Sequence, residues 1–186
     1  MTSFHTHAIH LAKYAATKAH QDQFRKNGKT PYIIHPERVA RRVKFFGGNH
    51  IGIIAAWLHD VMEDCDGGEG IVRETLQQME LLQQDRDEIF AIVSALTKND
   101  AVKGKSDKLA DSLSRINRAP CQAILIKLCD RIDNLGDGRD HGEKFLSGYL
   151  PLSDQLIDAL SEGAIKNGYR NALEILKAQR KTFRNY

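Results

Sequence analysis

Apolar residues recur at every third or fourth position along most of this chain. That spacing places apolar side chains on one face of an α-helix, because a helix completes a turn about every 3.6 residues. Alanine, leucine, isoleucine, lysine, arginine and glutamine fill the long segments, and only four prolines interrupt them. The pattern therefore predicts an all-α fold.

Caps and helix breakers indicate where the helices begin and end. We expect a first helix from a Ser3 cap to about Arg25, where residues 26–31 (Lys-Asn-Gly-Lys-Thr-Pro) break it. A second helix should begin at Pro36, which a first turn tolerates, and end at Gly47. Further helices are expected across residues 51–64, near 69–82, 85–97, 106–117 and 120–135, from about 153, and at 167–184, with a loop around 136–142.

The length of 186 residues fits one domain that can bury a substantial core. We expect a single domain over residues 1–186, with a motif-bearing part at about 5–150 and a C-terminal helical scaffold at about 151–186. No internal repeat divides the chain. A second catalytic domain would not fit within this length.

Charge and cysteine content exclude some classes of protein. The net charge is +3 and the basic residues are spread along the chain, so strong nucleic-acid binding is not expected. Three cysteines without a CxxC spacing argue against disulfides and favour a reducing compartment, by default the cytoplasm. No secretory pattern and no run of roughly 20 apolar residues occurs, so we expect neither processing nor membrane insertion.

Four polar side chains follow the most apolar run of the chain, which contains Trp57. They are His59, Asp60, Glu63 and Asp64. On one continuous helix, residues four apart share a face, so these side chains would point into one patch. Three carboxylates close together on a mostly buried helix repel each other and lose hydration. Because a bound cation would remove that cost, the segment predicts a metal site.

Two further residues extend this set. His35 follows an apolar lead-in at the start of the second helix, and Asp130 lies within a later, deeply apolar helix. With His59 and Asp60 they form a set of two histidines and two aspartates from three elements. Mixed nitrogen and oxygen ligands suit a six-coordinate ion such as Mn²⁺ better than a closed tetrahedral zinc.

A divalent ion at this position indicates hydrolytic chemistry. It would lower the pKa of a bound water, which could then attack a phosphoryl group. Glu63 and Asp64 could take the proton of that water or protonate the leaving oxygen. Asn134 lies one turn after Asp130 on the same helical face.

Three segments resemble the hydrolase domain of the RelA/SpoT family, within the HD superfamily of metal-dependent phosphohydrolases. They are residues 24–36 (FRKNGKTPYIIHP), 58–64 (LHDVMED) and 127–135 (KLCDRIDNL). The resemblance covers about residues 5–150 in the order and spacing of the family, and Thr97 and Lys98 resemble a further, weaker block. The short chain is similar to the free-standing small alarmone hydrolases.

The resemblance implies a Mn²⁺-dependent enzyme that acts on a nucleotide. The reaction would remove the 3′-pyrophosphate from guanosine 3′,5′-bis(diphosphate), ppGpp, or from the corresponding pentaphosphate, and it needs no synthetase half. By position, the resemblance assigns metal binding to His35, His59, Asp60 and Asp130. It assigns water activation to Glu63 and Asp64, and substrate contacts to Arg25, Lys26 and Asn134. Protein partners are left open.

The chain departs from the family pattern at three places. Cys65 stands where Thr or Ser is usual, Cys129 replaces a common Ala, and residues 66–86 lack a Phe-Gly turn. The third departure puts guanine specificity in question, so an adenosine alarmone such as ppApp, or the 2′-phosphate of NADPH, is an alternative substrate. A catalytically silent nucleotide-binding regulator is a third hypothesis, although intact Glu63 and Asp64 argue against it.

Simpler structural roles are open for several of these residues. Asp130 could be a buried carboxylate paired with Lys127 or Arg131, although the adjacent Arg131 would point about 100° away on a helix. His35 could cap a helix, and Asn134 could satisfy a buried backbone group.

For Arg25 and Lys26 the alternative to substrate contact is an ordinary solvated helix end, where cations are favoured. The other candidates are expected to play no part in chemistry, and Trp57 belongs to the core. Surface or packing positions are expected for His5, His7, His10, His20, His50 and His141. A solvated helix face is expected for Lys177, Arg180, Lys181 and Arg184.

Overall fold

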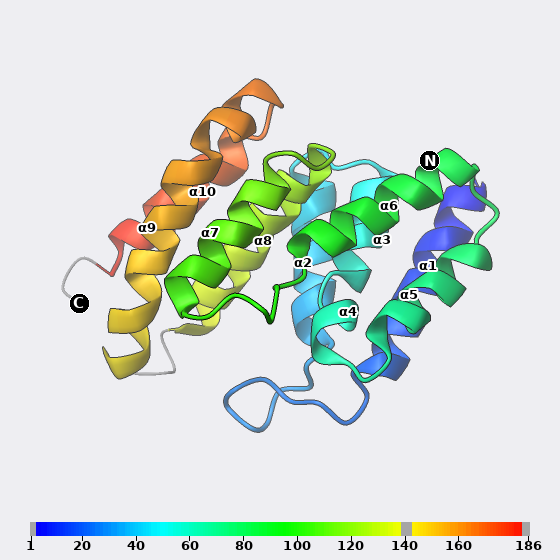
Figure 1. The fold of residues 1–186 in the computed structure, drawn as a ribbon, viewed down its shortest axis with the longest axis horizontal. Coiled ribbons are helices and arrows are strands. Elements are labelled where there is room, and N and C mark those ends of the chain that lie inside the picture. Colours follow the sequence, from blue (N-terminus) through cyan, green and yellow to red (C-terminus); the bar gives the residue numbers. More distant parts are fainter. Residues whose placement is uncertain (1–2, 139–142, 184–186) are drawn as a thin grey trace.

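The structure of the protein, a computed structural model, describes residues 3–138 and 143–183 and is built from helices (Figure 1). Within these residues there is no β-strand, and an isolated bridge joins Phe24 and Pro31. The expectation of an all-α fold is confirmed. The helices are α1 (Ser3–Ala19), α2 (Ile34–Phe45), α3 (His50–Leu58), α4 (Val61–Asp64), α5 (Gly68–Gln77), α6 (Gln83–Leu96), α7 (Lys105–Ile116), α8 (Gln122–Asp137), α9 (Glu143–Lys166) and α10 (Arg170–Lys181).

Helices α3 and α8 form the centre of the molecule. Every residue from Ile51 to Leu58 in α3 is buried, and Trp57 belongs to this core as expected. Helix α3 packs against α1, α2, α6 and α8, while α8 also contacts α2, α9 and α10. In Figure 1, α9 and α10 lie at one end of the molecule and α1 and α5 at the other. The two central helices therefore bring distant segments of the chain together.

Helix α1 ends before Arg25, so the predicted boundary is wrong. The chain turns back on itself there, with the backbone N–H of Arg25 donating to Thr30 O at 2.8 Å and Gly28 adopting a φ of 67°. From this loop, Gln23 Nε2 donates to the backbone carbonyl of Asp64 at 2.7 Å. A tertiary contact therefore overrides local helix propensity. As a result, residues 20–33 form a loop beside the short helix α4.

The predicted helix over residues 51–64 is interrupted at His59 and Asp60, and it resumes as α4. His59 Nδ1 donates to Ala56 O at 2.8 Å, and a continuing helix would give that carbonyl to the backbone N–H of Asp60. The side chain of His59 thus competes with the backbone at the end of α3. The break turns His59 and Asp60 toward α2 and α8, where they meet the other predicted ligands.

The remaining boundaries lie close to the predictions, with two exceptions. Helix α5 ends at Gln77, whereas the predicted helix runs to residue 82. Helix α9 begins at Glu143 and contains Pro151, whereas the sequence predicts a start near Ser153. Next to the proline, Ser153 Oγ donates to Tyr149 O at 2.9 Å, one turn earlier in the same helix. Residues 139–142 of the predicted loop and Arg184 lie outside the described residues.

No helix in the described ranges is both long enough and apolar enough to cross a lipid bilayer. The proposed division into a motif-bearing part and a C-terminal scaffold stays a prediction.

Candidate metal centre

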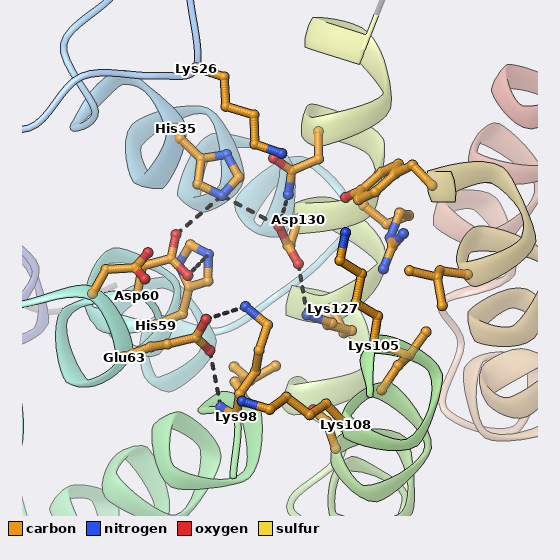
Figure 2. Close-up of a pocket in the computed structure, with 18 of the residues that line it drawn as sticks. Lys26, His35, His59, Asp60, Glu63, Lys98, Lys105, Lys108, Lys127 and Asp130 are labelled. Carbon is orange, nitrogen blue, oxygen red and sulfur yellow. Dashed lines mark hydrogen bonds and ion pairs between the residues drawn. The ribbon is translucent and has the colours of Figure 1, made fainter. Parts of the chain in front are cut away.

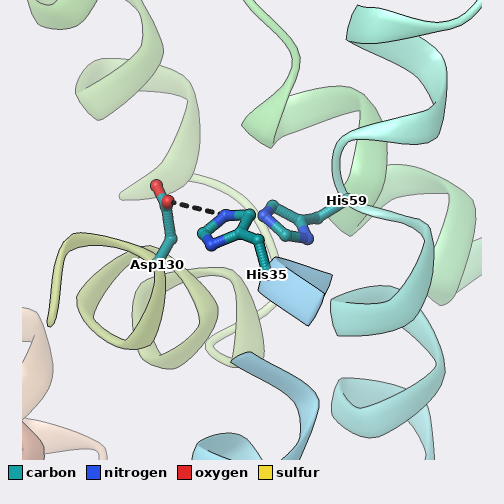
Figure 3. A group of neighbouring side chains, drawn as sticks. All are labelled: His35, His59 and Asp130. Carbon is teal, nitrogen blue, oxygen red and sulfur yellow. Dashed lines mark ion pairs between the residues drawn. The ribbon is translucent and has the colours of Figure 1, made fainter. Parts of the chain in front are cut away.

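Three buried donor side chains converge between α2, α3 and α8. His35 lies in the first turn of α2, His59 directly follows α3, and Asp130 lies in α8. One donor atom from each lies within 4.8 Å of the others, and His35 Nε2 is 3.4 Å from Asp130 Oδ1 (Figure 3). Across the described residues, no other set of at least three His, Cys, Asp or Glu donors is close enough to hold a metal ion.

Asp60 lies beside this group. Its Oδ1 is 3.2 Å from His59 Nε2, and its Oδ2 is 3.4 Å from His35 Nε2. The structure therefore brings the four predicted ligands together from three elements. Their role as ligands stays a prediction.

Hydrogen bonds leave one nitrogen of each imidazole available. His59 Nδ1 lies 2.8 Å from Ala56 O, which can only accept, so this nitrogen carries the proton. His59 Nε2 is buried and has no hydrogen bond within the described residues, although the Asp60 carboxylate is near. His35 Nδ1 lies 2.8 Å from Asp133 Oδ2, which leaves its Nε2 facing the other carboxylates. Histidines that ligate metals commonly bond in this way through the second nitrogen, so the residues fit a divalent ion.

The electrostatics of the group couple metal binding to protons. Burial lowers the pKa of His35, but the nearby carboxylates of Asp130, Asp133 and Asp60 outweigh it and raise the pKa to about 9. Burial would raise the pKa of Asp130, but Lys127 and His35 hold it well below its usual range. A metal requires neutral His35, so a proton and a cation compete for this residue.

Asp133 orients His35 from the side opposite the other carboxylates. Its side chain is buried, its Oδ2 faces His35 Nδ1, and its Oδ1 accepts from Arg42 Nη1 at 2.7 Å. Burial would raise the pKa of Asp133, but the hydrogen bond to His35 and the charge of Arg42 lower it. An ionised carboxylate therefore holds the imidazole in one orientation.

The hydroxyl of Tyr32 lies between two carboxylates. It is 2.8 Å from Asp60 Oδ2 and 2.7 Å from Asp64 Oδ2, and its single proton can serve only one of them at a time. Burial and the nearby charge of Asp60 raise the pKa of Asp64. Asp64 is therefore suited to carry a proton at this position.

Glu63 is held by the residue that follows Thr97. Its Oε2 accepts from the backbone N–H of Lys98 at 3.0 Å, and its Oε1 forms an ion pair with Lys98 Nζ (Figure 2). Burial lowers the pKa of Lys98, but the charge of Glu63 outweighs this effect and raises it. Lys98, from the segment that only weakly resembles the family pattern, thus contacts a residue of the site.

Arg25 is linked to Asp130 through one intermediate side chain. Arg25 Nη2 donates to Asn134 Oδ1 at 2.7 Å, and Asn134 Nδ2 donates to Asp130 Oδ1. Arg25 Nε also donates to Asp137 Oδ2 at 3.1 Å. Arg25 therefore does not form a solvated helix end, and the side chain of Asn134 is engaged with other side chains.

These residues border a cavity of about 580 Å³. Its lining includes every residue that the sequence predicts for the site, namely Arg25, Lys26, His35, His59, Asp60, Glu63, Asp64, Asp130 and Asn134. Seven basic and four acidic side chains line it, with apolar walls from Leu96, Leu109, Tyr149 and Leu152. A cavity of this size can hold a nucleotide-sized ligand.

The structure decides between two simpler partners for Asp130. Lys127 Nζ lies 2.9 Å from Asp130 Oδ2, whereas Arg131 donates to Ser153 Oγ at 3.2 Å and stacks over Tyr149. The ion pair with Lys127 engages one carboxylate oxygen, so Asp130 can still face His35 with the other.

The other histidines that can be placed have packing or surface positions. His20 is buried and bonded to Gln23 at 2.8 Å, and the rings of His5 and His50 stack. His141 lies outside the described residues.

Four residues of the site and its support are not predicted from the sequence. Tyr32 stands in an apolar lead-in, and Asp133 is not among the predicted residues, although its spacing of three from Asp130 could have identified it. Lys105 and Lys108 give no signal in the sequence, because lysines on an amphipathic helix usually face solvent.

Comparison with known proteins identifies a family. The family model described as HD domain matches residues 12–145. The chain is 34% identical over 134 residues to a guanosine-3′,5′-bis(diphosphate) 3′-pyrophosphohydrolase of Aquifex aeolicus, covering 70% of this chain and 18% of that protein. It is 31% identical over 194 residues to the bifunctional (p)ppGpp synthase/hydrolase SpoT of Escherichia coli, covering 92% and 26%. The chain thus spans about a quarter or less of the length of these curated relatives.

A solved structure shares the fold. It belongs to a metazoan ortholog of SpoT described as hydrolysing ppGpp, with a TM-score of 0.73, 21% identity and coverage of 97% of each chain. This likeness extends over both the motif-bearing segments and the C-terminal helices.

Proposed function

The chain belongs to the HD-domain family, and from this premise we propose that it is a metal-dependent guanosine-3′,5′-bis(diphosphate) 3′-pyrophosphohydrolase. The observation that carries the proposal is a group of metal donors beside seven basic side chains in one cavity. Positive charge around a metal centre suits a substrate with several phosphate groups. The activity printed for the relatives supplies the reaction.

We propose Mn²⁺ as the metal and His35, His59, Asp60 and Asp130 as its ligands. The support is the donor chemistry, with two imidazole nitrogens and two carboxylates, and the buried His59 Nε2 that lacks a hydrogen bond within the described residues. When bound, the ion would supply Lewis acidity and lower the pKa of a water molecule.

The reaction needs one proton acceptor and one proton donor. A water oxygen attacks the phosphorus next to the 3′ oxygen of the nucleotide, and the bond between that phosphorus and the 3′ oxygen breaks. Lys98 holds the Glu63 carboxylate in place, and the carboxylate has further lone pairs with which to accept a hydrogen bond from the water. Glu63 therefore accepts the proton of the water. Asp64 gives its proton to the 3′ oxygen, in keeping with its raised pKa. The products are GDP and pyrophosphate.

Arg25, Lys26 and Asn134 are proposed to contact the nucleotide. All three line the cavity, and Arg25 and Asn134 are held together by a hydrogen bond of 2.7 Å. A guanidinium held in place by Asn134 and Asp137 is preorganised for a polar ligand.

Residues 66–86, whose departure from the family pattern is the reason to consider other substrates, do not line the cavity. Those other substrates are ppApp and the 2′-phosphate of NADPH. The guanosine alarmone is therefore the substrate we favour.

A nucleotide panel tests the proposal. Purified protein is incubated with ppGpp, ppApp or NADPH, each with Mn²⁺ and with a chelator, and the products are separated by ion-exchange chromatography. We expect GDP and pyrophosphate from ppGpp only when Mn²⁺ is present. Faster turnover of ppApp or NADPH would replace the substrate, and binding without turnover of any nucleotide would favour a regulatory module.

A further inference from the structure

One face of α7 forms a wall of the cavity. None of the residues on this face is predicted to have a role from the sequence. Lys105, Lys108, Leu109 and Ser112 line the cavity, and their spacing of three, four and seven residues places them on one side of the helix. Figure 2 shows Lys105 and Lys108 on the side of the cavity away from His35. The face therefore lies across from the metal centre.

Neither lysine of this face pairs with a carboxylate of the metal centre, as two other lysines of the cavity do. Lys98 pairs with Glu63 and Lys127 with Asp130. The side chain of Lys105 has no ion pair or hydrogen bond with any residue in the described part of the chain. Lys108 pairs at 2.9 Å with Asp100, whose side chain is 99% exposed, and an exposed pair of this kind is readily exchanged for another anion.

A second polar group on the same face also lacks a partner. Ser112 is only 3% exposed, and its Oγ has no hydrogen bond within the described residues. A buried hydroxyl without a partner is costly, and it is commonly completed by a ligand or an ordered water. Ser112 lies one turn after Leu109 and Lys108 and lines the cavity with them.

The position of α7 is fixed by residues of the helix that do not line the cavity. Arg115 donates from Nη1 to the carbonyls of Ser94 and Ala95, both at 2.9 Å, and from Nη2 to that of Thr97 at 2.8 Å. Ser106 Oγ donates to Gln155 Oε1 in α9 at 3.3 Å. The lysines thus project from a helix that is anchored to both α6 and α9.

Positive charges face each other across the cavity. Burial and the charges of Arg25, Lys105 and Lys98 lower the pKa of Lys26. A bound anion between these cations would relieve their repulsion. Lysine ammonium groups act as point charges for phosphate, so a phosphate chain is the ligand that best suits this wall.

We propose that the Lys105–Lys108 face of α7 is a second phosphate subsite, which binds the 5′-phosphate chain of a nucleotide whose 3′-diphosphate lies at the metal centre. This inference rests on the proposed function and deepens it, because it makes the enzyme selective for nucleotides with phosphates on both sides of the ribose. A nucleotide with a 5′-hydroxyl would leave the subsite unused.

A substrate series tests this subsite. Guanosine 3′-diphosphates with a 5′-hydroxyl, 5′-monophosphate, 5′-diphosphate or 5′-triphosphate are hydrolysed by wild type and by the Lys105→Gln, Lys108→Gln double variant. For the 5′-diphosphate we expect the KM of the variant to rise about tenfold, since a hydrogen bond to a charged group contributes this much or more. The rise should shrink to under about twofold for the 5′-hydroxyl substrate, with kcat little changed throughout.

Matched variants separate this role from general charge effects. Lys103→Gln removes the same charge two residues earlier, where the side chain is exposed and does not line the cavity, and it should behave as wild type. Lys105→Arg, Lys108→Arg should retain most of the preference for 5′-phosphates. Thermal unfolding of each variant checks that the fold is intact.

The outcomes distinguish failure of the subsite from failure of the proposed function. An equal rise in KM for all four substrates, or no rise for the 5′-diphosphate, overturns the subsite. If wild type with Mn²⁺ hydrolyses none of them, the proposed function fails. In that case the subsite is tested by itself, by calorimetry of GDP and guanosine binding in the presence of chelator. The subsite predicts that GDP binds the double variant about tenfold more weakly than wild type, and that guanosine binds the two proteins equally.

Discussion

At the scale of single residues, we expect the buried pair of His35 and Asp133 to control the proposed metal centre, with Asp133 orienting His35 and not itself binding the ion. Asp133 fixes which nitrogen of His35 carries the proton, and His35 together with Arg42 lowers the pKa of Asp133. The Asp133→Asn substitution keeps the volume but removes the charge that orients the ring. We expect Mn²⁺ affinity, measured by calorimetry, to fall by about 10–100-fold.

The control for this prediction is Asp137→Asn, one turn further along α8. Asp137 accepts from Arg25 and Arg38 and does not contact His35, so Mn²⁺ affinity should stay near that of wild type. Equal affinities of Asp133→Asn and wild type would show that Asp133 does not orient the ligand.

The raised pKa of His35 predicts how stability depends on pH. The pKa rises from 6.5 in the unfolded chain to about 9 in the folded protein, so protonated His35 stabilises the fold fully below pH 6.5. This contribution is lost as the pH rises through 9. In chelator, urea unfolding should give a free energy that falls by up to about 3 kcal/mol between these pH values.

The same experiment with Mn²⁺ should show a smaller decline, because the metal binds neutral His35 and gains affinity as the proton is lost. The His35→Gln variant should lose most of the pH dependence in chelator. A metal-free wild type whose stability is flat or rises from pH 6.5 to 9 would contradict the assigned interactions of His35.

Glu63 is the residue on which the proposed chemistry depends most. The Glu63→Gln substitution retains an acceptor for the backbone N–H of Lys98 but cannot take a proton. We expect kcat for ppGpp to fall by about 10²–10⁴-fold, with Mn²⁺ affinity within about threefold of wild type. Glu69→Gln on the exposed face of α5 is the matched control, and an active Glu63→Gln protein would place the base elsewhere.

At the scale of elements, periodicity predicts the helices well but not the points where side chains compete with the backbone. The break after α3 arises because the side chain of His59 donates a hydrogen bond to the carbonyl of Ala56. A pattern of apolar residues cannot predict such a bond. The end of α1 is set by Gln23, which contacts the distant Asp64. Both failures occur where the chain forms the site, which is where local and tertiary preferences conflict.

The turn between α4 and α5 gives a prediction at this scale. A Cβ atom on Gly68 would lie 2.1 Å from Val61 O, a backbone atom in α4 that cannot move alone. Gly68→Ala should therefore destabilise the protein by about 3 kcal/mol and displace α4, which carries Glu63 and Asp64. Chemical unfolding and kcat for ppGpp measure the two effects.

Gly70→Ala is the control for this turn. It lies in the same helix with nothing within 4 Å of the added atom, so it should stabilise the protein slightly, by about 0.5 kcal/mol. Similar stabilities of the Gly68→Ala protein and wild type would show that the turn adapts without cost.

At the scale of the whole molecule, two buried helices bring together predicted metal ligands that are far apart in the sequence. Motif spacing predicts which residues meet, because His35, His59 and Asp130 lie in segments with a recognisable pattern. It does not predict the wall formed by α7, since Lys105 and Lys108 look like any solvated lysines until the fold places them at the cavity. The role of a charged side chain on a surface helix therefore depends on the groups that face it in the folded protein.

The most direct measurement is a titration of metal-free protein with Mn²⁺ while product formation from ppGpp is followed. The account predicts that activity rises until one Mn²⁺ is bound per chain, with GDP and pyrophosphate released in equal amounts, and that His59→Ala abolishes both binding and turnover. Full activity in chelator, or a Mn²⁺-loaded chain that releases no pyrophosphate, would contradict it.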